Sequence, residues 1–384
     1  MMCKRIKNAL LPVVILLILC VQGCACPQGT ELSKRLIVEA VGVDLDDGAY
    51  KVTLQALDAH AAGQSDDPNE NGSRTRLCSF TGATVGEALA GAAAETGLTP
   101  LYSQARVLVL GRSLAEQGVS APLDFFLREY HTRSDILIAV ADASAADILA
   151  ADPGGSVPGA VLLEEALLTG SENGECCAVK LFRFTGFLLS ETDTAYCPVV
   201  RLRSEDKGER PTAAPGETAF FQNGRLAFTA GPEITRGLLF LTDAVKKTSF
   251  TVRGEDGAYT LRVAKTDTTV RARKTDTDGA AFTVNVTAVC DITEFAASRF
   301  PDLGETQAAR AQTAGTAYLQ QLLNDAFGFL YGEHGADVCR LARRAALRFP
   351  KKEAAFREEL ARKTADIRLN AVLTVRRTGK ENLS

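Results

Sequence analysis

Residues 36–44 read LIVEAVGVD, residues 46–48 read DDG and residues 50–55 read YKVTLQ. The first segment is rich in branched apolar residues, and the last one alternates polar and apolar side chains, as half-buried strands do. An Asp-Gly pair between two such segments is a strong signal for a tight turn. This stretch therefore predicts a β-hairpin, from which the rest of the fold is built outward.

Helical and strand patterns alternate after this hairpin. Thr84 and Glu87 have the spacing of a capping box, in which both side chains accept hydrogen bonds from backbone N–H groups at a helix start. Further strands are expected at residues 106–111 and 136–141, and helices at residues 84–95, 122–130 and 143–151. This order of elements indicates a mixed sheet covered by helices.

The second half predicts an antiparallel meander behind a domain boundary. Residues 203–215 are charged and rich in Pro, Gly and Glu, which is typical of a linker, and Asn223-Gly224 then marks a hairpin. Strands are expected at residues 250–253, 259–263, 270–273, 282–292 and 367–375, and helices at 305–327 and 351–366. The predicted fold is α+β and multi-domain, with mixed and antiparallel sheets flanked by helices. We expect domains at residues 24–204, which can hold two subdomains, and at residues 215–384.

The N-terminus has the pattern of a lipoprotein signal peptide. Lys4, Arg5 and Lys7 precede an apolar run at residues 9–20, which is shorter than the ~20 residues of a spanning helix. Residues 21–24 read VQGC, which is similar to the bacterial lipobox, where the Cys thiolate accepts a diacylglyceryl group and the peptide is cut just before it. We therefore expect a signal peptide at residues 1–23 and lipidation of Cys24, with Cys26 as the alternative.

Composition limits the classes of function. The 384 residues include 47 acidic and 43 basic side chains, and cleavage before Cys24 would remove three basic ones, which changes the formal charge from −4 to −7. Nucleic-acid binding of the nonspecific kind needs clustered Lys and Arg, so this acidic balance disfavours it. With 46% apolar residues, the chain can form a sizeable core.

Motifs for catalysis or metal binding are missing from the sequence. GxSxG, GxxxxGK, GxGxxG and HExxH do not occur. No CxxC pair is present, and His60, His131 and His334 are scattered without ligand spacing, so we expect no metal and no cofactor. After cleavage and acylation of one Cys, an odd number of cysteines would remain, which does not imply a closed disulfide framework.

A few polar groups are weak candidates for chemistry. His131 also fits a solvated helix end, Asp46-Asp47 fits a turn, and Glu164-Glu165 fits an exposed helix face. A basic cluster either faces anionic headgroups or an acidic partner, or is a solvated helix face; it consists of Arg340, Arg343, Arg344, Arg348, Lys351 and Lys352. We therefore expect no catalytic residue and a protein that is not an enzyme.

Several segments, taken in order, resemble a known family. They are residues 31–32, 36–44, 50–55, 105–111, 114–118, 123–129 with Arg133, 139–149, 220–240, 325–328 and 349–351. Behind a lipobox, this order is similar to the Ger(x)C family of spore germination lipoproteins, the C subunits of nutrient germinant receptors in endospore-forming Firmicutes. The family's two Trp positions are not matched here, and alignment of Glu31 with the family pattern favours Cys26 over Cys24.

The resemblance implies a non-enzymatic subunit on the outer face of the spore inner membrane. It would be held there by a diacylglyceryl anchor, with palmitate among the acyl chains, and would work with integral membrane subunits of the A and B types to sense nutrients and start germination. Direct nutrient binding is left open. The rival class is a lipid-anchored solute-binding protein of a transporter, which needs a hinged cleft between two domains. The second half lacks the repeating βα order of such folds.

Overall fold

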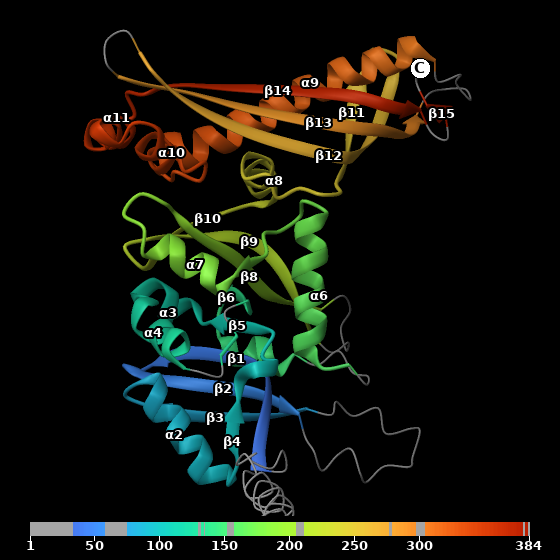
Figure 1. The fold of residues 1–384 in the computed structure, drawn as a ribbon. Helices are drawn as coiled ribbons and strands as arrows, with labels where there is room; N and C mark the ends of the chain where they lie inside the picture. Colours follow the sequence, from blue (N-terminus) through green and yellow to red (C-terminus); the bar gives the residue numbers. More distant parts are fainter. Residues whose placement is uncertain are drawn as a thin grey trace, which may run out of the picture.

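The computed structural model shows an elongated molecule with two β-sheets stacked along its length (Figure 1). The first sheet and its helices form one end, helix α8 (Pro232–Leu241) follows, and the second sheet forms the other end. The structure describes residues 34–57, 75–129, 132–133, 135–151, 157–204, 211–275, 279–296, 304–378 and 381–382. All structural statements below concern these residues.

The first sheet has ten strands. Their bounds are β1 (Arg35–Asp46), β2 (Ala49–Leu57), β3 (Thr75–Gly82), β4 (Thr99–Leu101), β5 (Val107–Leu110), β6 (Leu137–Ala141), β7 (Val179–Lys180), β8 (Ala195–Arg203), β9 (Thr212–Gln222) and β10 (Arg225–Ala230). The main order is β10-β9-β8-β6-β5-β1-β2-β3, while β4 pairs with β1 and β7 with β6. Pairing is parallel at the centre and antiparallel toward both edges, so the sheet is mixed, as predicted.

The opening hairpin is confirmed. Strands β1 and β2 pair in antiparallel fashion up to Asp46 and Ala49, which leaves a two-residue turn. Both turn residues have positive φ, +47° at Asp47 and +82° at Gly48. Asp and Gly are the residues that adopt this left-handed conformation at low cost, and it matches the twist of the flanking strands.

Helices cover both faces of the first sheet. On one face lie α5 (Ala145–Ala150) and α6 (Gly159–Glu172), and on the other α2 (Val85–Thr96), α3 (Arg112–Gln117), α4 (Ser120–Arg128) and α7 (Leu181–Leu188). Along β5, Val107 and Val109 face the first group, whereas Leu108 and Leu110 face the second. Because both faces are buried, the central strands read as unbroken apolar runs. A 3₁₀ turn, η3 (Tyr102–Gln104), follows β4.

The capping box is also confirmed. The N–H of Glu87 donates to Thr84 Oγ1 at 3.1 Å, and the Glu87 carboxylate accepts from the N–H of Ala83 at 2.8 Å. The helix ends at Gly97, whose φ of +67° is typical of a C-terminal cap. The sequence pattern thus gives both ends of α2 correctly.

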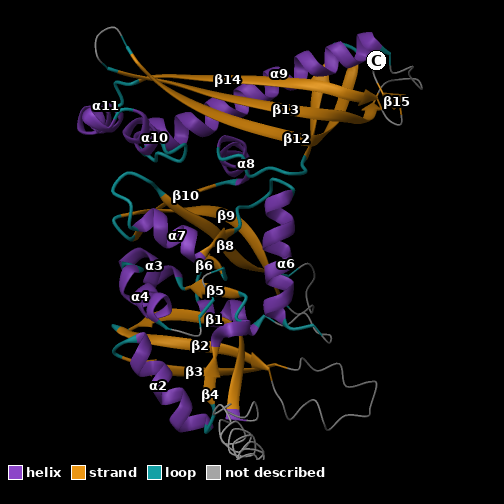
Figure 2. Cartoon of the chain, viewed as in Figure 1, coloured by secondary structure: helices purple, strands orange, loops and turns teal. Residues whose placement is uncertain are grey.

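The second sheet combines a meander with a returning strand. Its strands are β11 (Ser249–Gly254), β12 (Gly257–Lys274), β13 (Ala280–Ala296), β14 (Asp366–Thr378) and β15 (Glu381–Asn382), in that order. Between β13 and β14 the chain forms α9 (Glu305–Phe327), η4 (Gly328–Glu333), α10 (Leu341–Arg348), η5 (Pro350–Lys352) and α11 (Glu353–Ala361). This helical connection lets β14 lie parallel to β13, and α9 crosses one face of the sheet (Figure 2).

Three expectations are wrong in detail. The sequence assigns β9 and β10 to the second half, whereas β9 pairs with β8 and β10 pairs with β9 in the first sheet, so residues 203–215 connect two antiparallel strands of one sheet. The segments 259–263 and 270–273 belong to one strand, β12, because a register shift after Val263 lets pairing with β13 continue. Helix α11 ends at Ala361, where Lys363 takes a positive φ of +59°.

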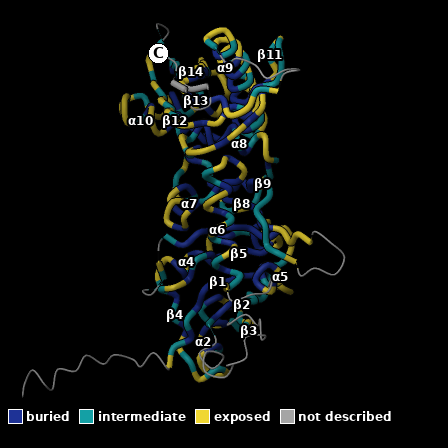
Figure 3. Tube along the Cα trace, turned by 90° about the vertical axis from the view of Figure 1, so that its right-hand side faces the viewer, coloured by how far each residue is buried: buried dark blue, intermediate teal, exposed yellow. Residues whose placement is uncertain are grey.

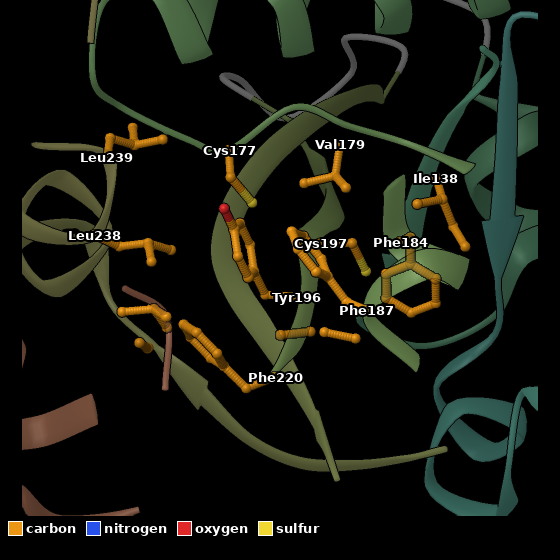
Figure 4. Close-up of a cluster of buried hydrophobic side chains, with 14 of the residues drawn as sticks. Ile138, Cys177, Val179, Phe184, Phe187, Tyr196, Cys197, Phe220, Leu238 and Leu239 are labelled. Atoms are coloured by element: carbon orange, nitrogen blue, oxygen red, sulfur yellow. The ribbon is translucent and has the colours of Figure 1, made fainter. Parts of the chain in front are cut away.

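The two sheets share one apolar core. A contiguous cluster runs from Val43 in β1 through Phe220 in β9 and Phe240 in α8 to Phe282 in β13. Buried chain segments accordingly follow the molecule along its length (Figure 3). Figure 4 shows the middle of this core, where Leu238 of α8 points toward Tyr196 and Phe220 of the first sheet.

Candidate functional site

The two candidate lipidation residues, Cys24 and Cys26, lie outside the described residues. The nearest described part is Lys34, followed by Arg35 and Ile37 of β1, which pair with the short strand β4. Figure 1 places this part at the end of the molecule opposite the second sheet. Among the described residues, no helix has the length and apolar character needed to cross a membrane.

The acidic turn that begins the chain's first hairpin has a structural role. Asp46 and Asp47 are exposed and form the end of β1 and its turn. The neighbouring Asp44 is buried, and its carboxylate accepts from the N–H groups of Ala145 and Ala146 at 2.8 and 2.9 Å. A carboxylate at a helix start satisfies N–H groups that have no partner within the helix, so Asp44 fixes α5 on β1.

Glu164 and Glu165 do not form a carboxylate pair. Glu165 is exposed, whereas Glu164 accepts from Arg106 Nη1 at 2.6 Å. Arg106 also donates through Nε to the buried Glu39 at 2.9 Å. These hydrogen bonds, the one to Glu164 first, raise the pKa of Arg106, which stays a cation. The triad of Glu39, Arg106 and Glu164 therefore joins α6 to β1. The other candidate, His131, lies outside the described residues.

The described cysteines are free, and five of them are buried. Cys176, Cys177, Cys197, Cys290 and Cys339 are buried, and Cys78 is half-buried. Burial raises the pKa of the thiols of Cys176, Cys290 and Cys339 to about 12. Thiolate is the nucleophilic form, so these thiols are inert at neutral pH. No cluster of three or more His, Cys, Asp or Glu suited to a metal is found among the described residues.

An open groove of about 490 Å³ lies between the start of α2 and α4. Its apolar lining includes Tyr50 and Phe125, while Asp124, Arg128 and Glu129 provide charged groups. Arg128 and Asp124 pair with each other at 2.8 Å. The groove belongs to the end of the molecule that carries β4 and the start of β1.

We define the joint as the contact between the α7–β8 connection and the segment 334–344. Its centre is Asp193, whose side chain is 1% exposed and accepts from Nε and Nη2 of Arg340 at 3.1 and 3.0 Å. Arg343 lies 3.7 Å from the same carboxylate oxygen. Arg340 also lies over the ring of Phe187 in α7. An ion pair between residues 147 positions apart thus links the two sheets.

Aromatic contacts extend the joint along β10. The ring of His334 stacks on Phe228, with 3.7 Å between ring centroids, and the His334 carbonyl accepts from Gln222 Nε2 at 3.0 Å. Phe228 in turn stacks on Phe220, a residue of the shared core. The joint is therefore packed and bonded from the surface to the interior.

Asp337 is a buried carboxyl group of the joint. It accepts from the N–H groups of Leu341 and Ala342 at 2.8 and 2.9 Å and so begins α10. Burial is the main cause that raises its pKa to about 6, and the nearby charge of Asp193 adds to the effect. The backbone hydrogen bonds oppose the shift.

This pKa predicts a pH dependence of stability. The folded Asp337 holds its proton up to about pH 6, whereas an unfolded Asp releases it near pH 3.9. The stability contribution of Asp337 is thus present below about pH 4 and is lost as the pH rises through 6. We expect the difference in free energy of unfolding between wild type and Asp337→Asn to change by about 1–3 kcal/mol between pH 4 and 7, in favour of the variant at pH 7. Urea titrations at several pH values measure it.

Asp124→Asn is the matched control, since this carboxylate is 56% exposed. It should show a much smaller change over the same pH range. Equal pH profiles for the two variants would contradict the role given to Asp337.

The basic cluster divides into two groups. Arg340 and Arg343 bind Asp193, an acidic partner within the chain. Arg344 and Arg348 instead line a hollow beside β12, and Lys351 is exposed. The joint was missed in the sequence because its partners come from distant segments. The local signal was Asp337, an acidic residue just before the helix that begins at Leu341, where the helix dipole favours a carboxylate.

The fold and the joint define the class of this protein. It is an α+β protein whose two sheet-based units share an apolar core and are linked by a buried ion pair. Two family models match this chain, "Spore germination protein N-terminal domain" over residues 28–202 and "Spore germination B3/ GerAC like, C-terminal" over residues 216–379. The chain belongs to this GerAC-like family of spore germination proteins. The boundary between the matches falls between β8 and β9, across which the first sheet continues.

Individual relatives agree with this assignment. YfkR of Bacillus subtilis (strain 168), which is named as a spore germination protein, is 25% identical over 245 residues. The match covers 62% of this chain and 62% of that relative. The crystal structure of the GerBC protein has a similar fold, with a TM-score of 0.55 and 14% identity, covering 88% of this chain and 96% of that one.

Proposed function

We propose that this protein is a lipid-anchored, non-enzymatic subunit of a nutrient germinant receptor on the outer face of the spore inner membrane. The observation that carries the proposal is the order of features along one chain. A signal-like segment and the VQGC motif are followed by both family regions, from residue 28 to residue 379. Integral membrane subunits of the A and B types are the proposed partners.

The short linker after the lipidated residue would limit how far each end of the protein can lie from the membrane. Ten residues lead from Cys24 to Lys34, so the linker spans at most about 35 Å. The end with β4 and α2 would therefore stay near the membrane, and the second sheet would lie farther from it. Of the acidic groups singled out in the sequence, Asp46 and Asp47 serve a turn and Glu164 an ion triad, which supports a binding role rather than catalysis.

The transporter alternative receives less support. A solute-binding protein closes two domains around a ligand by a hinge. Here the two sheets share a core, and the joint is bonded through Asp193 and Arg340. A second, separate groove adjoins the joint. It is open and lined by charged residues such as Glu191 and Arg357, which pair with each other.

Lipidation is tested with Cys24→Ala, Cys26→Ala and the double variant. We expect the double variant to leave the membrane fraction and the detergent phase of a Triton X-114 partition, because its anchor is missing. The single variant that behaves in the same way identifies the acylated residue. An unchanged membrane fraction of the double variant would sink the lipoprotein proposal.

The receptor role needs a separate measurement. Purification of the tagged full-length protein from detergent-solubilised spore membranes should recover two multispanning membrane proteins. Recovery of an ATPase and a permease would support the transporter alternative instead. Deletion should slow nutrient-triggered germination, and germination at the normal rate with every tested nutrient would contradict the proposed role.

A further inference from the structure

Part of strand β12 presents an open edge. Strand β11 pairs with β12 only from Gly257 to Arg262. The next stretch is covered by the end of α8 and the segment that follows it, because Thr268 Oγ1 donates to the carbonyl of Phe240 and Thr266 Oγ1 to that of Val245. Along residues 269–273, no described strand pairs with this side of β12. Backbone N–H and C=O groups of alternate residues therefore face outward there.

A hollow of about 530 Å³ follows this edge. Val270 and Ala272 of β12 and Leu347 of α10 provide its apolar lining. The Leu347 side chain is prominent, since the residue is 78% exposed. Helix α10 packs against β12 at this place, so the hollow has one wall of helix and one of strand.

The charged lining of the hollow is entirely cationic. It consists of Arg271, Arg273, Arg344 and Arg348, and no carboxylate lines the hollow. Among the described residues, Arg271, Arg273 and Arg348 form no ion pair. Cationic side chains also protect free edges from aggregation, which accounts for Arg271 and Arg273. It does not account for the exposed Leu347 or for the two arginines that α10 adds on the opposite wall.

We propose that this hollow binds an acidic, extended segment of a partner protein, which pairs with residues 269–273 of β12 as an added strand. Its backbone would satisfy the free edge over about 17 Å. Carboxylates on one face of the added strand would lie against Arg271 and Arg273, and apolar side chains on its other face would cover Leu347. Arg344 and Arg348 add to the positive charge around the segment. A lipid headgroup supplies charge but no strand of alternating donors and acceptors, so the free edge favours a polypeptide. This surface is independent of the tether and of the receptor role proposed above.

The test uses the full-length protein in detergent and a labelled decapeptide of alternating Glu and Val. We expect saturable binding, and an increase of at least about tenfold in Kd for Arg271→Glu/Arg273→Glu, because two attractions become repulsions. Arg253→Glu/Arg262→Glu is the matched control. Both of its residues are exposed on the same sheet, at positions where β11 and β12 already pair, so this variant should keep the wild-type Kd.

A second peptide separates strand pairing from simple charge attraction. It has the same side chains with methyl groups on alternate backbone nitrogens, and it should bind at least about tenfold more weakly. Equal binding of both peptides, equal losses in both double variants, or no saturable binding would each overturn the proposal. So would binding to phosphatidylglycerol vesicles that depends on Arg271 and Arg273 in the absence of peptide binding. Thermal melting checks that each variant is folded.

Discussion

Replacement of Arg340 by methionine is expected to lower the free energy of unfolding by about 3 kcal/mol, because a buried carboxylate loses its cation. The partner, Asp193, has a side chain that is only 1% exposed, and its Oδ1 atom already has no hydrogen-bond partner. Methionine keeps much of the packing over Phe187, so the loss reports mainly on charge. Arg343 lies 3.7 Å from the same carboxylate and can partly replace Arg340 as its cation. The expected loss of stability is therefore at the low end of the range measured for broken buried ion pairs.

Removal of the other partner of this ion pair should lower the free energy of unfolding by less. Asp193→Ala leaves Arg340, whose side chain is 34% exposed and can be hydrated, so we expect a loss of about 1 kcal/mol. Urea unfolding of Arg340→Met, Asp193→Ala and the double variant gives the coupling energy. If Asp193→Ala costs as much as Arg340→Met, packing rather than the buried charge dominates the joint.

Gly237→Val is expected to destabilise the protein by about 3 kcal/mol or more, through overpacking between α8 and α9. A Cβ atom built on Gly237 would lie 2.3 Å from Ala326 Cβ and 3.0 Å from the carbonyl oxygen of Leu322. The second contact is backbone, so the two helices must separate. Because α8 connects the two sheets, their shared core would open there. Thermal unfolding measures the effect.

Two further variants make this prediction specific. Ala326→Gly in the Gly237→Val background removes the closest contact and should restore part of the stability. Gly328→Ala is the control, since an added Cβ there meets no atom within 4 Å and the residue is helical, with φ −58°. It should leave stability unchanged or raise it by about 0.5–1 kcal/mol. A Gly237→Val protein as stable as wild type would rule out the close helix contact.

Local features were predictable from the sequence because they depend on neighbouring residues. The turn at Asp47 and Gly48 needs positive φ at two adjacent positions, and α2 needs a cap within its own first turn. Helix α9 was expected at residues 305–327 and is observed there, since its apolar stripe has helical spacing. Such signals lie within a few residues of one another.

Long-range pairing was not predictable in the same way. The segment 203–215 has the composition of a linker, yet β8 and β9 pair across it, and only tertiary structure decides which sheet a hairpin joins. The contact of Asp193 with Arg340 depends on how two distant loops meet. The proposed lipidation site is the reverse case, because the VQGC motif is visible in the sequence whereas Cys24 and Cys26 lie outside the described residues.

The parallel pairing of β13 with β14 has a consequence for folding order. Ala281 pairs with Asp366 and Val284 with Leu369, so the two strands meet across a separation of 85 residues. Closure of such a long loop is slow, and β13 keeps a free edge until β14 has left the ribosome. The first sheet has by then been synthesised in full, since its last strand ends at Ala230. Assembly of the second sheet is therefore the step at which the folding chain most needs protection from edge-to-edge aggregation.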